Sequence, residues 1–464
     1  MDVEEFVRRQ MDEGAGNDDI INKLANHIKR VKLVPTSYAE SFARAVIQEV
    51  ANTRGLKGDF FSYEQSGVHM GDFGVGSRGT GDFFAHRQIA RIIGRTSASV
   101  GVDEMDDAGA VLMDTLGKGT ESNKPGKMDP VSGTGHGGPY IICTVDGMHS
   151  RLSDFPFLAG FHVTRATLRD VYVMGAHPVM LFSDIHVADD GDVAKIFDYT
   201  AGITVVGEVM EVPLVTGSTL RIGGDMVLGS RMTGCVGAVG VARHLTARKE
   251  TRPGDVILMT EGAGGGTIAT AAIYSGFPEV VDATINLNFL LASEALLASE
   301  ALSTIHSMTD VTNGGLRGDV FEMAETANCR IIIDETEVGT LVQHDVARML
   351  MELSIDYLGV SLDALLITAP RSAVPAITSV IQGAGVTIKE IGRVEAGKPE
   401  SVLVTGGREH DFSPRFREAA YTPLKKVVES HQFDFEEMKV KVQGAADAAI
   451  EKKKRVIERI RPKP

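Results

Sequence analysis

Two long stretches of the chain alternate short apolar segments with helical sequences, and this alternation restricts the fold to the α/β class. In the first stretch, the strand-like segments are 108–113, 140–145, 179–187, 212–219 and 234–242, and the helical sequences are 158–176 and 192–210. In the second stretch, the strand-like segments are 256–260, 330–335, 364–370 and 387–394, and the helical sequences are 286–302 and 318–327. The charged turn RKETRPGD separates the two stretches. We therefore expect two α/β domains.

The length of 464 residues also indicates more than one domain, because single hydrophobic cores rarely extend so far. The sequence predicts four parts: a helical N-terminal extension at 1–55, domains at 56–248 and 249–405, and a charged, mostly helical tail at 406–464. The extension has the amphipathic pattern of an element that packs against another surface or subunit.

Composition restricts the partners. A net charge of −15 gives no electrostatic support for binding nucleic acid, and the basic end of the tail is typical of a solvated helix end. Cys143, Cys235 and Cys329 lie far apart, which argues against a structural zinc site or a redox pair. The charged N-terminus is not a secretory signal, and no apolar run approaches about 18 residues. We expect a cytoplasmic protein without a nucleic-acid or membrane partner.

Several carboxylates lie near predicted strand ends or beside glycines. They are Asp106 and Asp107 before a strand, Asp146 after one, Asp170 late in a helix, and Asp310 with Asn313 before a Gly-Gly turn. Each alone could be a turn or capping residue. As a set they indicate a metal site, because adjacent Asp106 and Asp107 repel unless a cation or hydrogen bonds offset them. Mg²⁺ prefers carboxylate oxygens and usually bridges to substrate phosphates.

Two glycine-rich turns, 260–271 and 310–320, lead into predicted helices. Backbone N–H groups at a helix N-terminus bind anions, although such turns also serve close packing. A third glycine segment, Gly74–Gly79, spells G-x-G-x-x-G. A dinucleotide fingerprint should follow a buried strand, whereas this one follows the short polar GVHMGDF, so an NAD site is disfavoured.

Basic and histidine side chains are further candidates for contacts to phosphate or substrate, and each has an alternative explanation. Arg78 suits a phosphate, and its alternative is a salt bridge to Asp72 or Asp82. The Gly-, Lys- and Pro-rich loop 116–140 suits a lid or plain disorder. Its residues Lys118, Lys124, Lys127 and His136 would then cover a nucleotide or lie in solvent. His149 could contact a substrate, but an exposed loop histidine is favoured.

The motifs follow one another in the order known from a single superfamily. They are the segment Gly74–Gly94, MDDAGAVLM, TVDG at 144–147, DVYVMGAHP at 170–178, LVTGST at 214–219, PGDVILMTEGAGGG and MTDVTNGGLRGDVFEMAE. The last is similar to the pattern DVTDGGLAGDLLEMA. Over roughly residues 70–400 the chain resembles the aminoimidazole ribonucleotide (AIR) synthase, or PurM-like, superfamily. Its members include HypE, selenophosphate synthetase and thiamine-monophosphate kinase.

This resemblance implies a PurM-like two-domain fold, with an N-terminal domain that pairs sheets in a homodimer and a C-terminal α/β sandwich domain. It also implies an enzyme that uses ATP and Mg²⁺ in a cleft to activate a small-molecule substrate by phosphorylation. Carried over by position, the metal ligands are Asp106, Asp107, Asp146 and Asp170. The nucleotide-binding residues are Gly76, Arg78, Gly79, Asp146 and Gly314. The catalytic positions are Asp310 and Asn313.

Three departures from the family pattern affect this expectation. Met105 replaces a Gly, Ser218 stands where several relatives have Asp, and Asn313 replaces an Asp, so the metal site or substrate could differ. Asp225 could compensate for Ser218. The absence of cysteine after Cys329 argues against a HypE-type relay, and its absence from 71–82 argues against a selenophosphate synthetase. The alternative function is a non-catalytic nucleotide-binding scaffold or a HypE-like maturation factor.

Overall fold

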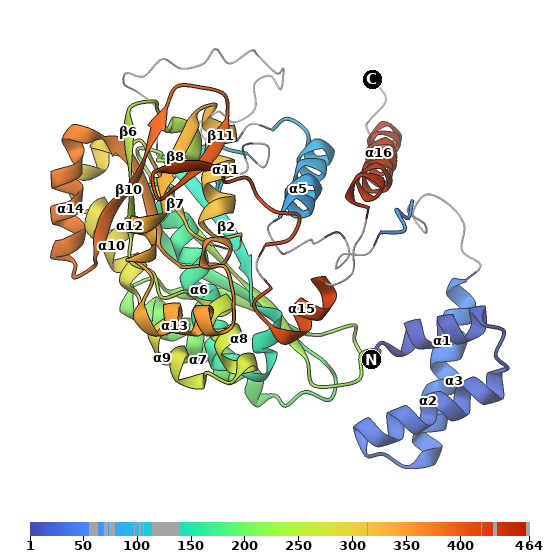
Figure 1. Ribbon diagram of the computed structural model, residues 1–464. Coiled ribbons are helices and arrows are strands. Elements are labelled where there is room, and N and C mark those ends of the chain that lie inside the picture. Colours follow the sequence, from blue (N-terminus) through green and yellow to red (C-terminus); the bar gives the residue numbers. More distant parts are fainter. Residues whose placement is uncertain are drawn as a thin grey trace.

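The structure is a computed structural model of the chain (Figure 1). It describes residues 1–54, 64–68, 73, 79–96, 98–101, 104, 106–113, 139–312, 314–418, 420–429 and 434–460. Two β-sheets with packed helices form the body, and further helices lie at both ends of the chain (Figure 1). The expected α/β class, two-domain architecture and helical termini are therefore confirmed.

The first sheet has five strands in the order β1-β2-β5-β3-β4, and only the β3–β4 pair is parallel. Its strands are β1 (Gly109–Leu112), β2 (Tyr140–Gly147), β3 (His177–Val187), β4 (Leu214–Arg221) and β5 (Met232–Ala242). Helices α6 (Pro156–Val173) and α7 (Ala194–Val209) pack on one face. The two helices approach closely because Gly160 and Gly202 lack side chains. A Cβ on Gly160 would lie 2.1 Å from the Tyr199 carbonyl oxygen.

The opposite face of the first sheet carries exposed apolar side chains. Val145 of β2 is 61% exposed and Leu220 of edge strand β4 is 57% exposed. Val145 and Phe182 lie in one row across the sheet, since both pair with Gly237 of β5. Exposed apolar side chains on a sheet face are typical of a surface that contacts another protein.

The second sheet has seven strands in the order β12-β11-β8-β10-β6-β9-β7. They are β6 (Asp255–Thr260), β7 (Ser307–Asp310), β8 (Arg330–Asp334), β9 (Leu365–Pro370), β10 (Ile388–Glu395), β11 (Glu400–Thr405) and β12 (Arg408–Asp411). Alternation places Ile257 and Met259 on one face, and Val256 and Leu258 on the other.

Each face of the second sheet belongs to a different apolar core. Val256 and Leu258 share a continuous buried cluster with α6, which joins the two domains. Ile257 and Met259 pack in the other cluster, with helices on the opposite side.

The helices around this sheet are α8 (Gly266–Ser275), α9 (Val281–Thr284), α10 (Asn288–Leu297), α11 (Gly315–Ala327), α12 (Glu335–Gly339), α13 (His344–Glu352) and α14 (Val374–Gly383). Short 3₁₀ turns are Ser150–Asp154, Arg248–Glu250, Pro278–Val280, Glu300–Thr304, Tyr357–Gly359 and Arg371–Ala373.

The helix expected over 286–302 is shorter than its sequence suggests. Helix α10 ends at Leu297, and Ser299 caps a separate 3₁₀ turn by accepting a hydrogen bond from the Ala301 N–H. Within the described chain, 278–297 is the one helical stretch with the length and apolar composition to cross a membrane, and 44% of its apolar window is buried. Buried residues such as Leu290 and Leu296 place α10 in the core.

The N-terminal helices form a small unit of their own beside the body (Figure 1). They are α1 (Val3–Asp12), α2 (Asn17–Lys32) and α3 (Thr36–Thr53), and they enclose a separate apolar cluster. The unit contacts the body where the Val3 N–H donates to the Met226 carbonyl oxygen at 2.9 Å. Lys32 adds ion pairs to Asp189 and Asp190.

The C-terminal segment returns to the body after β12. Residues 406–411, expected in a helical tail, lie instead in the β11–β12 hairpin, because Arg408–Asp411 pairs residue by residue with β11. The chain then leads to α15 (Pro423–Glu429) and α16 (Phe435–Ile460). Helix α16 packs along α5 (Thr80–Ile93), where Lys453 Nζ donates to the Ile92 carbonyl oxygen at 2.6 Å (Figure 1).

Candidate active site

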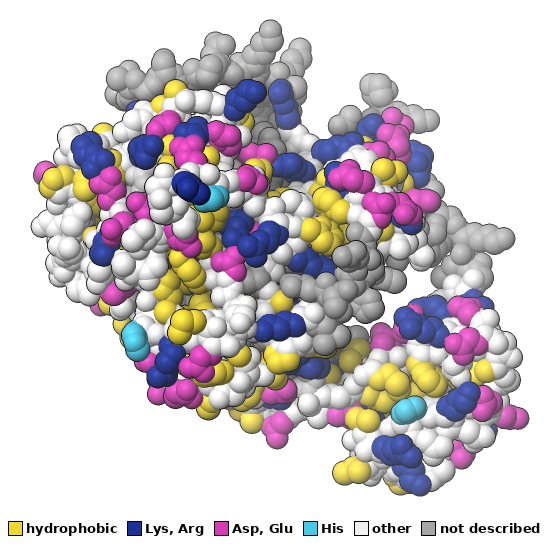
Figure 2. Space-filling view, in the orientation of Figure 1, with side chains coloured by type: hydrophobic (Ala, Val, Ile, Leu, Met, Phe, Trp, Pro, Cys, Tyr) yellow, Lys and Arg dark blue, Asp and Glu magenta, His cyan; other side chains and the backbone are white. Residues whose placement is uncertain are grey.

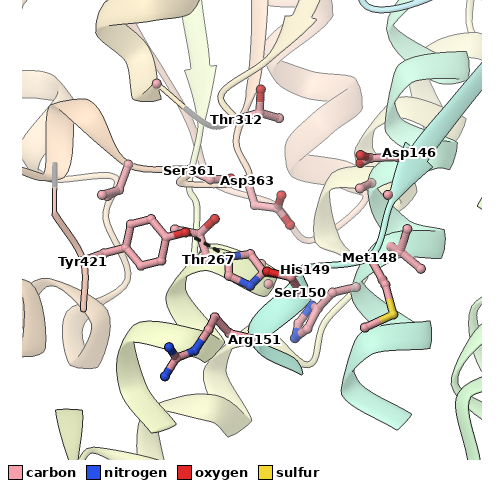
Figure 3. Close-up of a pocket in the computed structure, with 18 of the residues that line it drawn as sticks. Asp146, Met148, His149, Ser150, Arg151, Thr267, Thr312, Ser361, Asp363 and Tyr421 are labelled. Atoms are coloured by element: carbon pink, nitrogen blue, oxygen red, sulfur yellow. Dashed lines mark hydrogen bonds between the residues drawn. The ribbon is translucent and has the colours of Figure 1, made fainter. Parts of the chain in front are cut away.

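A cavity of about 820 Å³ lies where β2 and α6 of the first domain meet the glycine turns of the second. Figure 3 shows Asp146 and Thr312 at one end of it and Arg151 at the other, with His149 and Tyr421 between them. The lining residues come from the segment before β1, the end of β2 and the following turn, one side of α6, the turns before α8 and α11, the segment before β9, and the C-terminal segment. They include Asp107, Thr144, Asp146, His149, Arg151, His162, Arg169, Asp170, Gly265, Gly266, Thr267, Thr312, Gly314, Asp363, Arg417, Glu418, Tyr421 and Lys425.

One end of the cavity is acidic. Asp146 lies within β2 rather than after it, and Asp170 lies in the last turn of α6. Thr144 Oγ1 donates a hydrogen bond of 2.9 Å to Asp170 Oδ2. Burial and the nearby carboxylates of Asp310, Asp146 and Asp107 raise the pKa of Asp170 well above its ordinary value. Such crowding of like charges is relieved by a bound cation.

Asp106 and Asp107 are held by Arg248. The Arg248 backbone N–H donates to Asp106 Oδ2 at 2.9 Å, and its guanidinium contacts Asp107 Oδ1 at 2.6 Å. The same buried guanidinium also pairs with Glu322 at 2.6 Å. Burial raises the pKa of Asp106 to about 7. Arg248 therefore supplies hydrogen bonds that offset the repulsion between Asp106 and Asp107.

The four predicted metal ligands do not form a complete ion cage. Among the residues that the structure describes, no three His, Cys, Asp or Glu side chains are grouped to hold a metal ion. Mg²⁺ commonly takes one or two carboxylates and completes its shell with water and substrate phosphates. The carboxylates of Asp146 and Asp170, which line the cavity, fit that incomplete arrangement.

A buried chain of charges joins α6 to the second domain. Arg169 Nε lies 3.1 Å from Asp310 Oδ2, and both Arg169 and Arg165 contact Asp363. Arg165 also donates to the carbonyl oxygens of Gly264 at 2.8 Å and Thr284 at 2.7 Å. Burial and the charge of Arg169 lower the pKa of Arg165 to about 9. This network fixes the glycine turn before α8 against α6.

The two glycine turns open toward the cavity. Gly314 has a φ of +103° and Gly315 a φ of +64°, which L side chains rarely adopt. A Cβ on Gly315 would lie 2.3 Å from the Leu358 carbonyl oxygen, so only glycine fits. Gly314 lines the cavity at the start of α11, and Gly265 and Gly266 line it at the start of α8. Thr312 Oγ1 is buried there without a hydrogen-bond partner among the described residues.

The other predicted residues have varied positions. Gly76, Arg78, Met105, Asn313 and the loop residues Lys118, Lys124, Lys127 and His136 lie outside the described residues. Gly79 does not line the cavity but packs against Phe416, whose carbonyl oxygen would lie 2.3 Å from an added Cβ. Ser218 pairs with Asp184 in the sheet, and Asp225 contacts Arg221; neither lines the cavity.

His149 is not the exposed loop residue that the sequence favoured. Its Nε2 lies 3.0 Å from the Tyr421 hydroxyl and its Nδ1 lies 3.1 Å from Thr270 Oγ1. Burial and the charges of Lys425 and Arg151 lower the pKa of His149 to about 4. His149 is therefore neutral at pH 7 and lies inside the site.

Sequence reasoning missed the arginines and the C-terminal wall. The sequence places Arg248 in a charged turn, which favours an exposed side chain. Its position just before a buried strand was the one indication that the side chain could be buried. Arg165 and Arg169 lie four residues apart in an otherwise apolar helix, which was a readable sign of buried charge. Nothing in the sequence connected Tyr421 with His149.

Models of two protein domains match the chain. Residues 128–242 match the N-terminal domain of AIR synthase related proteins, and residues 252–405 match their C-terminal domain. The chain belongs to the AIR synthase related family. The matched segments of this AIR synthase related protein cover most of the two sheets and the cavity between them.

Curated relatives share the family. An uncharacterized protein of Methanocaldococcus jannaschii is 47% identical over 99% of this chain and 98% of its own length. The selenide, water dikinase of Myxococcus xanthus is 27% identical over 56% of this chain and 81% of its own. The thiamine-monophosphate kinase of Pyrococcus abyssi is 26% identical over 54% of this chain and 74% of its own.

Solved structures share the fold. The HypE–HypF complex aligns with a TM-score of 0.54 and 16% identity over 70% of this chain and 98% of that one. Hydrogenase maturation protein HypE in complex with ATP aligns with a TM-score of 0.51 and 19% identity over 63% of this chain and 90% of that one. The resemblance to the PurM-like superfamily is confirmed.

Proposed function

We propose that this AIR synthase related protein transfers the γ-phosphoryl group of ATP to a small metabolite and releases ADP. The observation that carries this proposal is one cavity in which the carboxylates of Asp107, Asp146 and Asp170 face glycine turns at two helix N-termini. Phosphoryl transfer needs positioning and charge neutralisation more than covalent chemistry. Backbone N–H groups at the helix starts suit phosphate oxygens.

Relatives support an ATP-dependent activity. Two of them are named as kinases, and a HypE structure of the same fold contains ATP. In this chain, Asp146 and Asp170 would hold Mg²⁺, which supplies neutralising charge to the phosphates when bound. Asp310 would lie near the transferred group, where Arg169 orients its carboxylate. The nucleotide-binding roles of Gly76, Arg78 and Gly314 and the catalytic role of Asn313 remain part of the same proposal, whereas Gly79 packs against Phe416 outside the cavity.

Calorimetry with a non-hydrolysable ATP analogue, with and without Mg²⁺, tests the proposal. We expect Mg²⁺-dependent binding that falls at least about tenfold in Asp146→Asn and Asp170→Asn, because charge-assisted interactions are lost. Asp225→Asn is the matched control, since it removes the same charge from an exposed residue outside the cavity. Absence of binding, or equal binding in all variants, would contradict the proposal.

The second candidate is a nucleotide-binding scaffold without turnover. It is favoured by Arg248, which already pairs with Asp107 and so removes one carboxylate from the predicted metal set. A scaffold would bind the ATP analogue but release no phosphate from ATP in the presence of any metabolite. A metabolite screen for ADP formation separates the two.

A further inference from the structure

We propose that Arg151 and the C-terminal residues Tyr421 and Lys425 form a subsite for an anionic group, a phosphate or a carboxylate, on the second substrate. This inference rests on the proposed phosphoryl transfer and specifies the substrate class. The subsite lies at the end of the cavity opposite the carboxylates, where Figure 3 shows Arg151 and Tyr421 beside His149.

Ion pairs hold the C-terminal segment against the body of the protein. Arg317, which is buried at the start of α11, pairs with Glu418 at 2.6 Å and with Asp356 at 2.7 Å. Arg415 contacts the same Asp356 at 3.0 Å. Buried ion pairs with several hydrogen bonds hold one geometry. The wall of the cavity is therefore built before a ligand arrives.

Two cations of this end have no acidic partner among the residues that the structure describes. Arg151 stacks over the Tyr274 ring at 4.0 Å, and its Nε is buried with no hydrogen-bond partner in the described parts of the chain. Lys425 Nζ lies 4.1 Å from the centre of the Tyr421 ring. Within the described part of the chain, no carboxylate lies within 4.0 Å of either charged group. Unpaired cations inside a cavity attract an anionic ligand.

Other polar groups at this end suit the same ligand. His162 is 5% exposed and its Nδ1 has no hydrogen-bond partner among the described residues. The start of α8, Gly265–Thr267, lines the same cavity and presents a helix N-terminus.

The acidic groups nearby are already neutralised. Glu418 pairs with Arg317, and Asp363 pairs with Arg165 and Arg169. Burial lowers the pKa of His149, and the charges of Lys425 and Arg151 lower it further, in agreement with a positive surrounding. Figure 2 shows basic side chains near the middle of this face, where the segment before α15 crosses the body in Figure 1. The cavity thus has an acidic end for Mg²⁺ and nucleotide phosphates and a basic end for a second anion.

Titration of the full-length protein with sodium phosphate and, separately, sodium succinate at constant ionic strength tests the subsite. We expect calorimetry to show binding of at least one anion, weakened about tenfold or more in Arg151→Gln and in Lys425→Gln. Arg151→Lys and Lys425→Arg keep the charge and should restore part of the binding. Lys398→Gln removes an equal charge from an exposed loop and should bind as the wild type does. Circular dichroism checks that each variant is folded.

The two arms distinguish phosphate from carboxylate, and a parallel titration with the ATP analogue and Mg²⁺ separates this inference from the proposed function. Anion binding that depends on Arg151 and Lys425 but not on Asp146 supports the subsite, even if the nucleotide does not bind. Nucleotide binding without any anion binding overturns the subsite and leaves the proposed function standing. Equal anion binding in wild type, Arg151→Gln and Lys425→Gln also overturns it.

Discussion

The imidazole of His149 lies 3.0 Å from the Tyr421 hydroxyl, although 272 positions separate the two residues along the chain. Thr270 of α8 lies 3.1 Å from the other ring nitrogen. One neutral side chain therefore connects the turn after β2, the second domain and the C-terminal segment. The proton affinity of that side chain gives the first prediction.

The pKa of His149 predicts a loss of stability in acid. The folded-state pKa is about 4 against an ordinary value of 6.5, so the unfolded chain binds more protons between these values. The contribution of His149 to the free energy of unfolding is fully present above pH 6.5 and disappears as the pH falls to about 4. At most this contribution is about 3 kcal/mol. His149→Gln should flatten the pH dependence of the free energy of unfolding, measured by urea denaturation at pH 7.5 and 4.5. Burial also lowers the pKa of His162, so the free energy of unfolding of His149→Gln should still fall somewhat in acid. An unchanged slope in His149→Gln would show that this histidine is protonated in the folded state.

Replacement of Arg248 by methionine should destabilise the protein strongly. The variant leaves the carboxylates of Asp107 and Glu322 buried without their cation, which typically costs about 3–5 kcal/mol. Urea denaturation measures the loss. Arg371→Met is the control, because its partner Glu390 and Arg371 itself are exposed, so the free energy of unfolding should change little. Equal effects of the two substitutions would refute the structural role of Arg248.

Alanine at Gly79 or Gly81 should displace the segments that pack against them. An added Cβ would lie 2.3 Å from the Phe416 carbonyl oxygen at Gly79 and 1.9 Å from the Phe73 carbonyl oxygen at Gly81. We expect faster limited proteolysis within 412–429 and a lower melting temperature. Gly444→Ala in α16 meets no atom within 4 Å and should stabilise that helix by about 0.5–1 kcal/mol. Proteolysis at the wild-type rate in Gly79→Ala would argue against this packing.

The exposed face of the first sheet predicts a homodimer. Val145 and Leu220 lie uncovered there, and pairing of such faces would remove apolar area from water. Light scattering on the purified protein should give twice the mass of one chain, and Val145→Asp together with Leu220→Asp should halve it. Val440→Asp, on exposed α16, should leave the mass unchanged. A monomeric wild-type protein would contradict this prediction.

The sequence was sufficient for the fold because its signals are local. The hydrophobic pattern of strand-like segments such as 179–187 and 387–394 can be recognised within each segment alone. The family motifs also occur in chain order. The same order brought Asp107, Asp146 and Asp170 to one cavity. The break after Leu297 was not predictable from composition, since the apolar residues continue and the capping hydroxyl of Ser299 decides it.

The remainder of the site depends on distant contacts. Arg248 reads as a turn residue because its partners Asp107 and Glu322 come from separate segments. The C-terminal segment reads as a solvated helix because its helices do carry charge, and only the tertiary fold places Tyr421 and Lys425 at the cavity. A single sequence contains no signal for a contact across 272 positions.

The cavity wall that contains Tyr421 and Lys425 follows both sheets in the chain. During synthesis the acidic end of the cavity and both glycine turns leave the ribosome first, and the cationic wall emerges last. A chain cut after Asp411 would keep every strand of both sheets yet lose Tyr421 and Lys425. Under the two proposals above, such a chain would keep the acidic end of the cavity and both glycine turns but lack Lys425, one of the two cations proposed to bind the second anion.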